Sequence, residues 1–432
     1  MKPLLIKGGR IIDPSQKLDE VGSLLITEGK ISWQGKGEAP KGDYDIIDAS
    51  GLIVCPGLID LHTHLREPGY EEKETIASGA RAAARGGFTT IGCMPNTNPP
   101  LDSQTAIEFI KSKAAEAAVR VLPIGCITKG RKGKEITEMG ELAKSGVIAF
   151  SDDGEPALSS YVMRQALDYS RAFNLPITDH CEDTILTEGG QMNEGIVSAR
   201  LGLRGIPNAA EDIIVARDLA LAQLTGGWLH IAHTTTAGAV ELIRRAKEKG
   251  VKVTAEATPH HLTLTEERVI GYNTNAKVNP PLRTEKDIEA LIEGLKDNTI
   301  DIIATDHAPH TEGDKLCEFA KAPFGISGLE TALGALMGLV HAKKLSLNTL
   351  IAKLTVEPAK ILGDKHGKLG TLAVGAEADV TIFDPALEWV VNTEGFVSKG
   401  RNTPLAGEKL KGKVIATIYG GKIVFKDEAQ RS

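Results

Sequence analysis

Two histidines and an arginine stand at alternate positions, His62, His64 and Arg66, at the end of an apolar stretch that begins at Val54. If this stretch is a strand, both imidazoles lie on one face and can point to a single position, with the guanidinium at the exit. Two imidazoles arranged in this way are half of a site for a divalent metal ion. An isolated pair is more often part of an ordinary buried strand whose histidines hydrogen-bond to the backbone. The metal interpretation therefore depends on further ligands elsewhere in the chain.

The elements that would position these side chains lie between residues 56 and 366, where short apolar strand patterns alternate with amphipathic helix patterns. Counting the stretch that ends at His64, this region holds eight strand candidates. Eight buried strands alternating with helices predict an α/β fold, the parallel (β/α)8 or TIM barrel with helices outside. A doubly wound open sheet is the alternative, but the Gly-x-Gly-x-x-Gly turn usual after its first strand is missing.

The two ends of the chain share a different texture. Residues 1–55 and 367–432 both contain short strand patterns separated by glycine, proline and acidic turns. Neither end alone offers enough apolar surface for a stable core. We therefore predict that 1–55 and 367–432 together form one small composite β-sandwich, and that the catalytic barrel of residues 56–366 is inserted between them.

Ligand-type side chains gather at the carboxyl ends of five expected strands, which is where catalytic groups collect in barrel enzymes. Independent structural residues would scatter over helices and both barrel ends. Histidine and carboxylate together suit a borderline divalent ion such as Zn²⁺ and leave a coordination position for water. The coincidence favours a metal site. The five groups are His62-Thr63-His64, Ser151-Asp152-Asp153-Gly154, Asp179-His180-Cys181-Glu182-Asp183, His233-Thr234-Thr235 and Thr305-Asp306-His307-Ala308-Pro309-His310.

Not every member of these groups need be a ligand. Of Asp152 and Asp153, one can point inward while its neighbour points away, and the sequence does not choose between them. Of His230 and His233 we prefer His233, because it stands at the end of its strand and His230 lies within the apolar run. The adjacent histidines 260–261 follow the seventh strand, where a structural role is as plausible as a catalytic one.

Composition and charge exclude several classes of protein. The net charge of −7 argues against general affinity for nucleic acid or anionic membranes, because binding phosphate groups needs a concentrated basic surface. The one dense basic run, residues 129–134, has no interleaved aromatic side chains, and we interpret it as a solvated loop. Five widely spaced cysteines are typical of reduced core residues. We find no apolar signal region and no stretch long enough to span a bilayer, and expect a cytoplasmic protein.

The motifs together resemble a known family along nearly the whole chain. The first-strand pattern Pro56-Gly57-Leu58-Ile59-Asp60-Leu61-His62-Thr63-His64 is similar to that of the amidohydrolase superfamily, whose members are metal-dependent barrels with a flanking β-sandwich. A narrower set resembles the bacterial class I dihydroorotases. That set is His64-Leu65-Arg66-Glu67-Pro68-Gly69, Met94-Pro95-Asn96-Thr97, Ser151-Asp152-Asp153-Gly154, Asp179-His180-Cys181-Glu182-Asp183, Asn279-Pro280-Pro281-Leu282-Arg283 and Ala304-Thr305-Asp306-His307-Ala308-Pro309-His310.

The resemblance implies one or two zinc ions and assigns their ligands. Several relatives, hydantoinases among them, bridge two metals with a carboxylated lysine. This chain has no lysine at the tip of the fourth strand, and the resemblance gives the bridging role to Asp153. The implied ligands are His62, His64 and Asp306 for one zinc, and His180 and His233 for a second.

The resemblance also implies the reaction, which is the reversible cyclisation of N-carbamoyl-L-aspartate to L-dihydroorotate in pyrimidine biosynthesis. Asp306 would be the catalytic proton shuttle between the attacking water and the ring nitrogen. The residues implied to hold the substrate carboxylate are Arg66, Asn96 and His310. Those implied to contact the pyrimidine ring are Asn279, Phe324 and Gly325, and His64 is implied as a further substrate contact. Arg66 is the best discriminator, because its planar fork suits a carboxylate that hydantoins and allantoin lack.

Two rival functions remain at this point. The first is another cyclic-amide hydrolase, an allantoinase or hydantoinase that shares the metal but not the carboxylate pocket. The second is a metal-free scaffold for aspartate transcarbamoylase, which we disfavour because this chain keeps all the ligands, although an active enzyme can also bind that partner. We expect a homo-oligomer that binds a small-molecule substrate. The polar segment 311–323 is interpreted either as a mobile loop or as a passive surface excursion.

Overall fold

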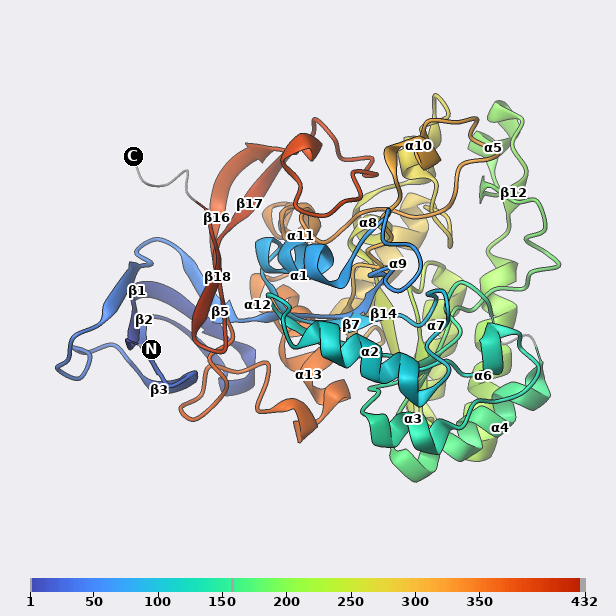
Figure 1. Cartoon of the computed structure of the whole chain (residues 1–432). Coiled ribbons are helices and arrows are strands. Elements are labelled where there is room, and N and C mark those ends of the chain that lie inside the picture. The colour runs from blue at the N-terminus through green and yellow to red at the C-terminus, as the bar shows by residue number, and fades with distance from the viewer. Residues whose placement is uncertain (1, 157–158, 428–432) are drawn as a thin grey trace.

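The structure is a computed structural model that describes residues 2–156 and 159–427. Both ends of the chain contribute to one mixed sheet, and the middle of the chain forms an α/β region (Figure 1). Figure 1 shows the blue N-terminal strands and the red C-terminal strands on one side of the molecule, and most helices on the other. Among the described residues, no helix is both long enough and apolar enough to cross a membrane.

The mixed sheet has eight strands in the order β18-β17-β16-β5-β1-β2-β3, and β4 pairs with β1. The strand β5 joins the two ends of the chain, because its Val54 lies opposite Ile11 of β1 and Ile382 of β16. All three side chains belong to one buried apolar cluster. The strands are β1 (Leu4–Asp13), β2 (Leu18–Thr27), β3 (Lys30–Gly35), β4 (Asp45–Asp48), β5 (Ile53–Pro56), β16 (Val380–Val390), β17 (Lys409–Tyr419) and β18 (Lys422–Lys426).

The middle of the chain contains eight short parallel strands. They form a three-stranded sheet, β6-β7-β8, and a five-stranded sheet, β15-β14-β13-β10-β9. Parallel bridges join Gly125 to Phe150 and Thr63 to His307, one at each meeting of the two sheets. The α/β class is therefore confirmed. The strands are β6 (Leu58–Thr63), β7 (Phe88–Cys93), β8 (Arg120–Pro123), β9 (Phe150–Ser151), β10 (Ile177–Asp179), β13 (Leu229–Ile231), β14 (Val253–Ala257) and β15 (Ile302–Ile303), with a separate pair β11 (Met192–Asn193) and β12 (Gly205–Ile206).

Helices follow most of the parallel strands, and several begin at a capping side chain. Thr75 and Thr236, for example, accept a hydrogen bond from the third residue of the helix that each precedes. The helices are α1 (Ile76–Arg85), α2 (Gln104–Ala114), α3 (Met139–Ser145), α4 (Ser160–Ser170), α5 (Ile196–Leu201), α6 (Ala209–Thr225), α7 (Ala237–Glu248), α8 (Pro259–Thr263), α9 (Glu285–Lys296), α10 (Glu312–Lys315), α11 (Ala332–His341), α12 (Leu347–Leu354) and α13 (Val356–Leu362).

The apolar run before His62 is two strands rather than one. It divides at Gly57, so β5 belongs to the mixed sheet and β6 to the parallel region. The amide of Gly57 donates to the carbonyl of Asp379, and a Cβ at this position would lie 2.1 Å from Thr89 Oγ1. Only glycine fits where the chain passes this closely from one sheet to the other. The strand that carries His62 and leads to His64 is thereby anchored at the sheet made by both chain ends.

Candidate metal centre and substrate site

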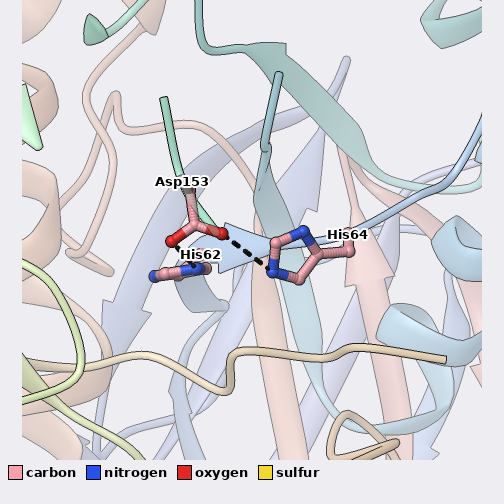
Figure 2. Close-up of side chains that lie close together, drawn as sticks. All are labelled: His62, His64 and Asp153. Atoms are coloured by element: carbon pink, nitrogen blue, oxygen red, sulfur yellow. Dashed lines mark ion pairs between the residues drawn. The ribbon is translucent and has the colours of Figure 1, made fainter. Parts of the chain in front are cut away.

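The carboxyl end of β6 places His62 and His64 in a buried position beside Asp153, which follows β9. Figure 2 shows the Asp153 carboxylate between the two imidazoles. Its Oδ1 lies 3.4 Å from His62 Nε2, and its Oδ2 lies 3.4 Å from His64 Nε2. Every residue of β6 is buried, so hydrophobic burial fixes the strand and the alternation of side chains aims both imidazoles at the same carboxylate.

The same carboxylate also faces a second pair of histidines. Asp153 Oδ1 lies 3.5 Å from His233 Nε2 and 3.9 Å from His180 Nδ1, and these two imidazole nitrogens are 2.9 Å apart. His180 follows β10 and His233 follows β13. Burial opposes ionisation of Asp153, but the surrounding imidazoles, His62 foremost, hold the pKa of this carboxyl well below its usual range. Asp153 is thus an ionised group shared by two sets of imidazoles.

Asp306 completes the first of these sets from the end of β15. Its Oδ1 lies 3.0 Å from His64 Nε2 and 3.5 Å from His62 Nε2. Burial opposes its ionisation, yet the hydrogen bond to His64 and the field of His62 bring the pKa of Asp306 to about 2. Its backbone has a φ of 46°, in a region that residues other than glycine seldom occupy and that is often found at functional sites.

The site has the chemical features of a place for a metal ion. His62 Nε2 and Asp153 Oδ1 are buried, and neither has a hydrogen-bond partner within residues 2–156 and 159–427. Such atoms are costly to leave unsatisfied, and they face each other. The ligand atoms of His62, His64 and Asp153 lie within 4.8 Å of one another, as do those of Asp153, His180 and His233. A donor set of imidazoles and a carboxylate fits a divalent ion.

The structure also places the neighbours that the sequence left open. Asp152 turns away from the cluster, and its Oδ1 accepts hydrogen bonds from the amides of Ile127 and Thr128. His230 is bonded at both nitrogens, to Thr254 and Glu256, and therefore lies outside the cluster. The two histidines at 260–261 differ. Both nitrogens of His261 are bonded, whereas His260 Nε2 is buried without a partner among the described residues.

Glu256, in β14, is a residue of the site that the sequence did not reveal. Its carboxylate lies 2.5 Å from His62 Nδ1 and 3.1 Å from His230 Nε2, and it accepts a hydrogen bond from the His233 amide. A partner on Nδ1 fixes the His62 ring so that Nε2 faces Asp153. The available signal was a glutamate between two alanines in a strand, since a charge buried there needs partners.

The residues expected at the substrate carboxylate include Arg66 and Asn96, which lie next to His64 in sequence or in space. Arg66 Nε donates to the carbonyl of Pro309, and its Nη atoms make no hydrogen bond within the described part of the chain. Asn96 Oδ1 lies 2.8 Å from His64 Nδ1, which turns the other ring nitrogen of His64 toward the aspartates. The Asn96 amide nitrogen remains available to an acceptor. His64 therefore joins both residues to the cluster of histidines and aspartates: Asn96 contacts its ring, and Arg66 follows it by two positions in the chain.

His310 is held in one orientation. Its Nε2 lies 2.8 Å from the Phe324 carbonyl, which can only accept, so this nitrogen carries the hydrogen. Its Nδ1 is buried without a hydrogen-bond partner among the described residues and lies 3.8 Å from Asp314. Burial and the Arg66 guanidinium lower the pKa of His310 to about 3. The neutral ring therefore presents a lone pair at Nδ1.

Of the residues expected at the pyrimidine ring, Asn279 is held through its side chain and Gly325 through its backbone. The Asn279 amide donates to Glu182 Oε2 at 2.9 Å, and Glu182 also lies 2.9 Å from His180 Nε2, so Asn279 is tied to the second histidine pair. The Gly325 amide donates to the Lys277 carbonyl, and the Gly325 carbonyl accepts a hydrogen bond from the Asn402 side chain. A Cβ on Gly325 would lie 2.9 Å from His310 Nε2, so glycine is required here by the close approach of that ring.

Segment 311–323, whose mobility stays a prediction, contains a short helix and buried anchors. Helix α10 begins after Thr311, and the buried Lys315 donates to the carbonyls of Thr274 and Pro323. Asn402, from the chain between β16 and β17, bonds both sides of the neighbouring turn. It accepts from the His310 amide and donates to the carbonyls of Ala308 and Gly325. Nothing in the local sequence selects Asn402, since these partners lie 77 to 94 residues before it.

The interpretation of residues 129–134 as a solvated loop is wrong for Arg131. Its guanidinium donates to the carbonyls of Asp152 and Asp153, the second at 2.6 Å. Lys129, Lys132 and Lys134 in the same run are exposed, as expected. Spacing along a basic run cannot show which side chain turns inward, because that depends on a strand end remote in sequence.

Known proteins of one family are similar to this chain over nearly its whole length. A family model described as dihydro-orotase-like matches residues 51–238, and one described as amidohydrolase family matches residues 199–425. The chain is 52% identical over 429 residues to a dihydroorotase of Pelotomaculum thermopropionicum, covering 99% of this chain and 100% of that protein. It is 53% identical to a dihydroorotase of Citrifermentans bemidjiense, covering 98% and 99%. The structure of an L-hydantoinase (dihydropyrimidinase) from Arthrobacter aurescens is similar at a TM-score of 0.88 and 25% identity, covering 99% and 96%.

Proposed function

Because the chain belongs to the dihydroorotase family of amidohydrolases, we propose how its buried histidines and aspartates carry out the family's reaction. The chain is a cyclic amidohydrolase that interconverts N-carbamoyl-L-aspartate and L-dihydroorotate, a step of pyrimidine biosynthesis. The forward reaction closes a ring by forming an amide bond with loss of water, and the reverse reaction opens it. The proposals below concern the barrel, the metal, the proton shuttle and the substrate contacts.

We infer that the two parallel sheets are arcs of one closed (β/α)8 barrel. The parallel bridges Gly125–Phe150 and Thr63–His307 support closure, since they stand at the two places where the sheets meet. In such a barrel the eight carboxyl ends converge, which accounts for ligands drawn from β6, β9, β10, β13 and β15. The division into 56–366 and a composite of 1–55 with 367–432 rests on the sheet shared by both ends.

The metal is proposed to be zinc, one or two ions per chain. His62, His64 and Asp306 would hold the first, His180 and His233 the second, and Asp153 would bridge them. Asp153 Oδ1 lies near His62 and His233, and its Oδ2 lies near His64, so this one carboxylate contacts imidazoles of both sets, which supports the bridging role. When bound, zinc polarises the amide carbonyl and makes water a nucleophile near neutral pH.

Asp306 is the proposed proton shuttle. Its Oδ1 is engaged with His64, which leaves Oδ2 to exchange a proton with the substrate. In ring opening, Asp306 takes the proton of the attacking water and delivers it to the ring nitrogen as the amide bond breaks. In ring closure it takes the proton of the carbamoyl nitrogen and returns it to the departing oxygen. The Asp306 carboxylate starts ionised and therefore has a lone pair that can take up the proton.

The carboxylate that does not react is proposed to lie against Arg66, Asn96 and His310. The two Nη atoms of Arg66 provide a planar fork that matches a carboxylate. Asn96 adds an amide donor. His310 can donate from Nδ1 only after taking up a proton, because its other nitrogen is already bonded to a carbonyl. Asn279, Phe324 and Gly325 would border the ring.

The observation that carries the proposed metal centre is that two buried atoms facing each other, His62 Nε2 and Asp153 Oδ1, have no hydrogen-bond partner among the described residues. The test combines metal analysis with a cyclisation assay on the wild type and on His62→Ala. We expect zinc and activity in the wild type and loss of both in the variant. A wild type that cyclises carbamoyl aspartate after complete removal of metal would contradict the proposal. Hydantoin and allantoin as parallel substrates address the nearest rival, and an inactive, metal-free wild type would favour the scaffold.

Assembly and location stay predictions. We expect a homo-oligomer and a place in the cytoplasm, and association with aspartate transcarbamoylase is an open outcome of the test. Light scattering on the purified chain, alone and with the transcarbamoylase, measures the oligomeric state and this association.

A further inference from the structure

Arg131 lies on the loop between β8 and α3 and is not one of the proposed metal ligands. Its side chain contacts the backbone of Asp152 and Asp153 rather than the ligand atoms. Its Nη2 donates to the carbonyl oxygens of Asp152 and Asp153, at 3.1 Å and 2.6 Å, and its Nε donates to the first of these at 3.3 Å. One rigid guanidinium thus holds two consecutive peptide groups, one of which belongs to the residue shared by both histidine sets.

The loop that carries Arg131 is itself fixed to the same strand end. The Asp152 carboxylate accepts hydrogen bonds from the amides of Ile127 and Thr128, at 2.9 Å and 3.1 Å. The Gly133 amide donates to Thr128 Oγ1. The contacts are therefore reciprocal. The loop amides donate to the side chain of Asp152, and the Arg131 guanidinium of the same loop donates to the backbone carbonyls of residues 152–153.

This bracing matters because an aspartate side chain is short. With two side-chain torsions, Asp153 can reach the imidazoles of both sets only if its backbone is held in one place. Its carboxylate makes four contacts of 3.4 to 3.9 Å, so a shift of the peptide by an ångström would break the match on one side. The next residue, Gly154, has a φ of 80° and supplies no stiffness of its own.

We propose that Arg131 is a positioning residue that holds the Asp153 carboxylate between the two histidine sets, so that metal affinity depends on its fork-shaped contact with the backbone. This inference rests on the proposed metal centre. It assigns Arg131 no contact with the substrate. The prediction is specific to this cation, because Lys129 in the same run is exposed and pairs with Glu135, and Lys132 is exposed.

The test measures zinc affinity directly, by competition between the metal-stripped protein and a chromophoric zinc chelator. The variants are Arg131→Gln, Arg131→Lys and the matched control Lys132→Gln. We expect Arg131→Gln to weaken the most weakly held zinc at least tenfold, and Arg131→Lys, which keeps the charge but not the fork, to weaken it by a smaller factor. Lys132→Gln should stay within twofold of the wild type. If only one zinc binds, the same comparison applies to that ion, because Asp153 belongs to both sets.

A kinetic measurement separates positioning from general damage. We expect Arg131→Gln to lower kcat at saturating zinc while the KM for carbamoyl aspartate stays within twofold, since Arg66 and Asn96 are untouched. Wild-type zinc affinity in both Arg131 variants overturns the inference. If Arg131→Gln fails to fold, Arg131→Lys decides alone, and its retention of wild-type affinity is the overturning result. His62→Ala serves as the reference for the proposed function, because wild-type zinc affinity in that variant would remove the metal centre itself.

Discussion

Replacing Arg66 by methionine tests how this chain selects its substrate. Methionine has a similar length but neither charge nor donors, so it keeps most of the packing and removes the fork. Arg66 Nε is used on the Pro309 carbonyl, and the two Nη atoms make no hydrogen bond within the described residues. A substrate carboxylate would therefore gain one two-pronged contact from this side chain. Dihydroorotate carries this carboxylate, whereas dihydrouracil is the same ring without it.

The magnitude follows from that count. A hydrogen bond to a charged group contributes about 1.5–3 kcal/mol. The loss is smaller than the sum for two such bonds, because Asn96 and His310 also bind the carboxylate and remain in the variant. We therefore expect Arg66→Met to lose about 3 kcal/mol of transition-state binding to dihydroorotate, or about a hundredfold in kcat/KM. Dihydrouracil makes no such contact, so its kcat/KM should change by less than about threefold.

The assay measures ring opening of both substrates by their loss of ultraviolet absorbance, in the wild type and in Arg66→Met at equal zinc content. The expected result is that the preference of the wild type for dihydroorotate collapses in the variant. An equal loss on both substrates would refute the reasoning, because it would show that Arg66 supports the fold or the metal rather than the carboxylate. No change on either substrate would show that the carboxylate binds elsewhere.

Four further outcomes follow from the site. Asp306→Asn, which keeps the size of the side chain but cannot take a proton, should lower kcat by about a thousandfold or more in either direction of the reaction. Glu256→Gln, at the back of His62, should weaken zinc binding by about 10–100-fold in a chelator competition, and unchanged affinity would contradict its orienting role. Asn402→Ala removes hydrogen bonds worth about 1 kcal/mol each, so it should lower Tm and raise the KM for dihydroorotate through His310, whereas a lower Tm with unchanged KM would confine it to stability. Because His310 Nδ1 must gain a proton to hold a carboxylate, calorimetric titration of dihydroorotate in buffers of different ionisation enthalpy should show proton uptake, and its absence would exclude that contact.

Much of the site could be predicted because its ligands share one place in the fold. His62, His180, His233 and Asp306 each stand at a strand end, and hydrophobic patterning is enough to find strand ends. The same patterning favoured His233 over His230, and the structure places His233 in the cluster. Placing Asp153 inward required more than periodicity, since Asp152 has the same chemistry. The Asp152 side chain points away from the cluster because its carboxylate accepts hydrogen bonds from the amides of residues 127–128.

The residues that were not predicted act through contacts distant in sequence. Glu256 lies inside a strand, and Arg131 lies in a basic run whose neighbours are exposed. The division of the apolar run at Gly57 was missed for a similar reason, because the partners that separate β5 from β6 are Thr89 and Asp379. Pattern analysis compares each residue with its neighbours along the chain. The roles of these residues depend on partners that become neighbours only in the folded structure.

The pairing of β5 with both β1 and β16 has a consequence for how the chain is made. During synthesis, β5 leaves the ribosome more than 300 residues before β16 exists, and until then one edge of the N-terminal strands lacks its neighbour. Asn402, which braces the turn at His310, emerges later still. The hydrogen bonds from Asn402 to the Ala308 and Gly325 carbonyls can form only when that last segment is added. A protein shortened at its C-terminus should therefore lose both an edge of its sheet and the support of its substrate site.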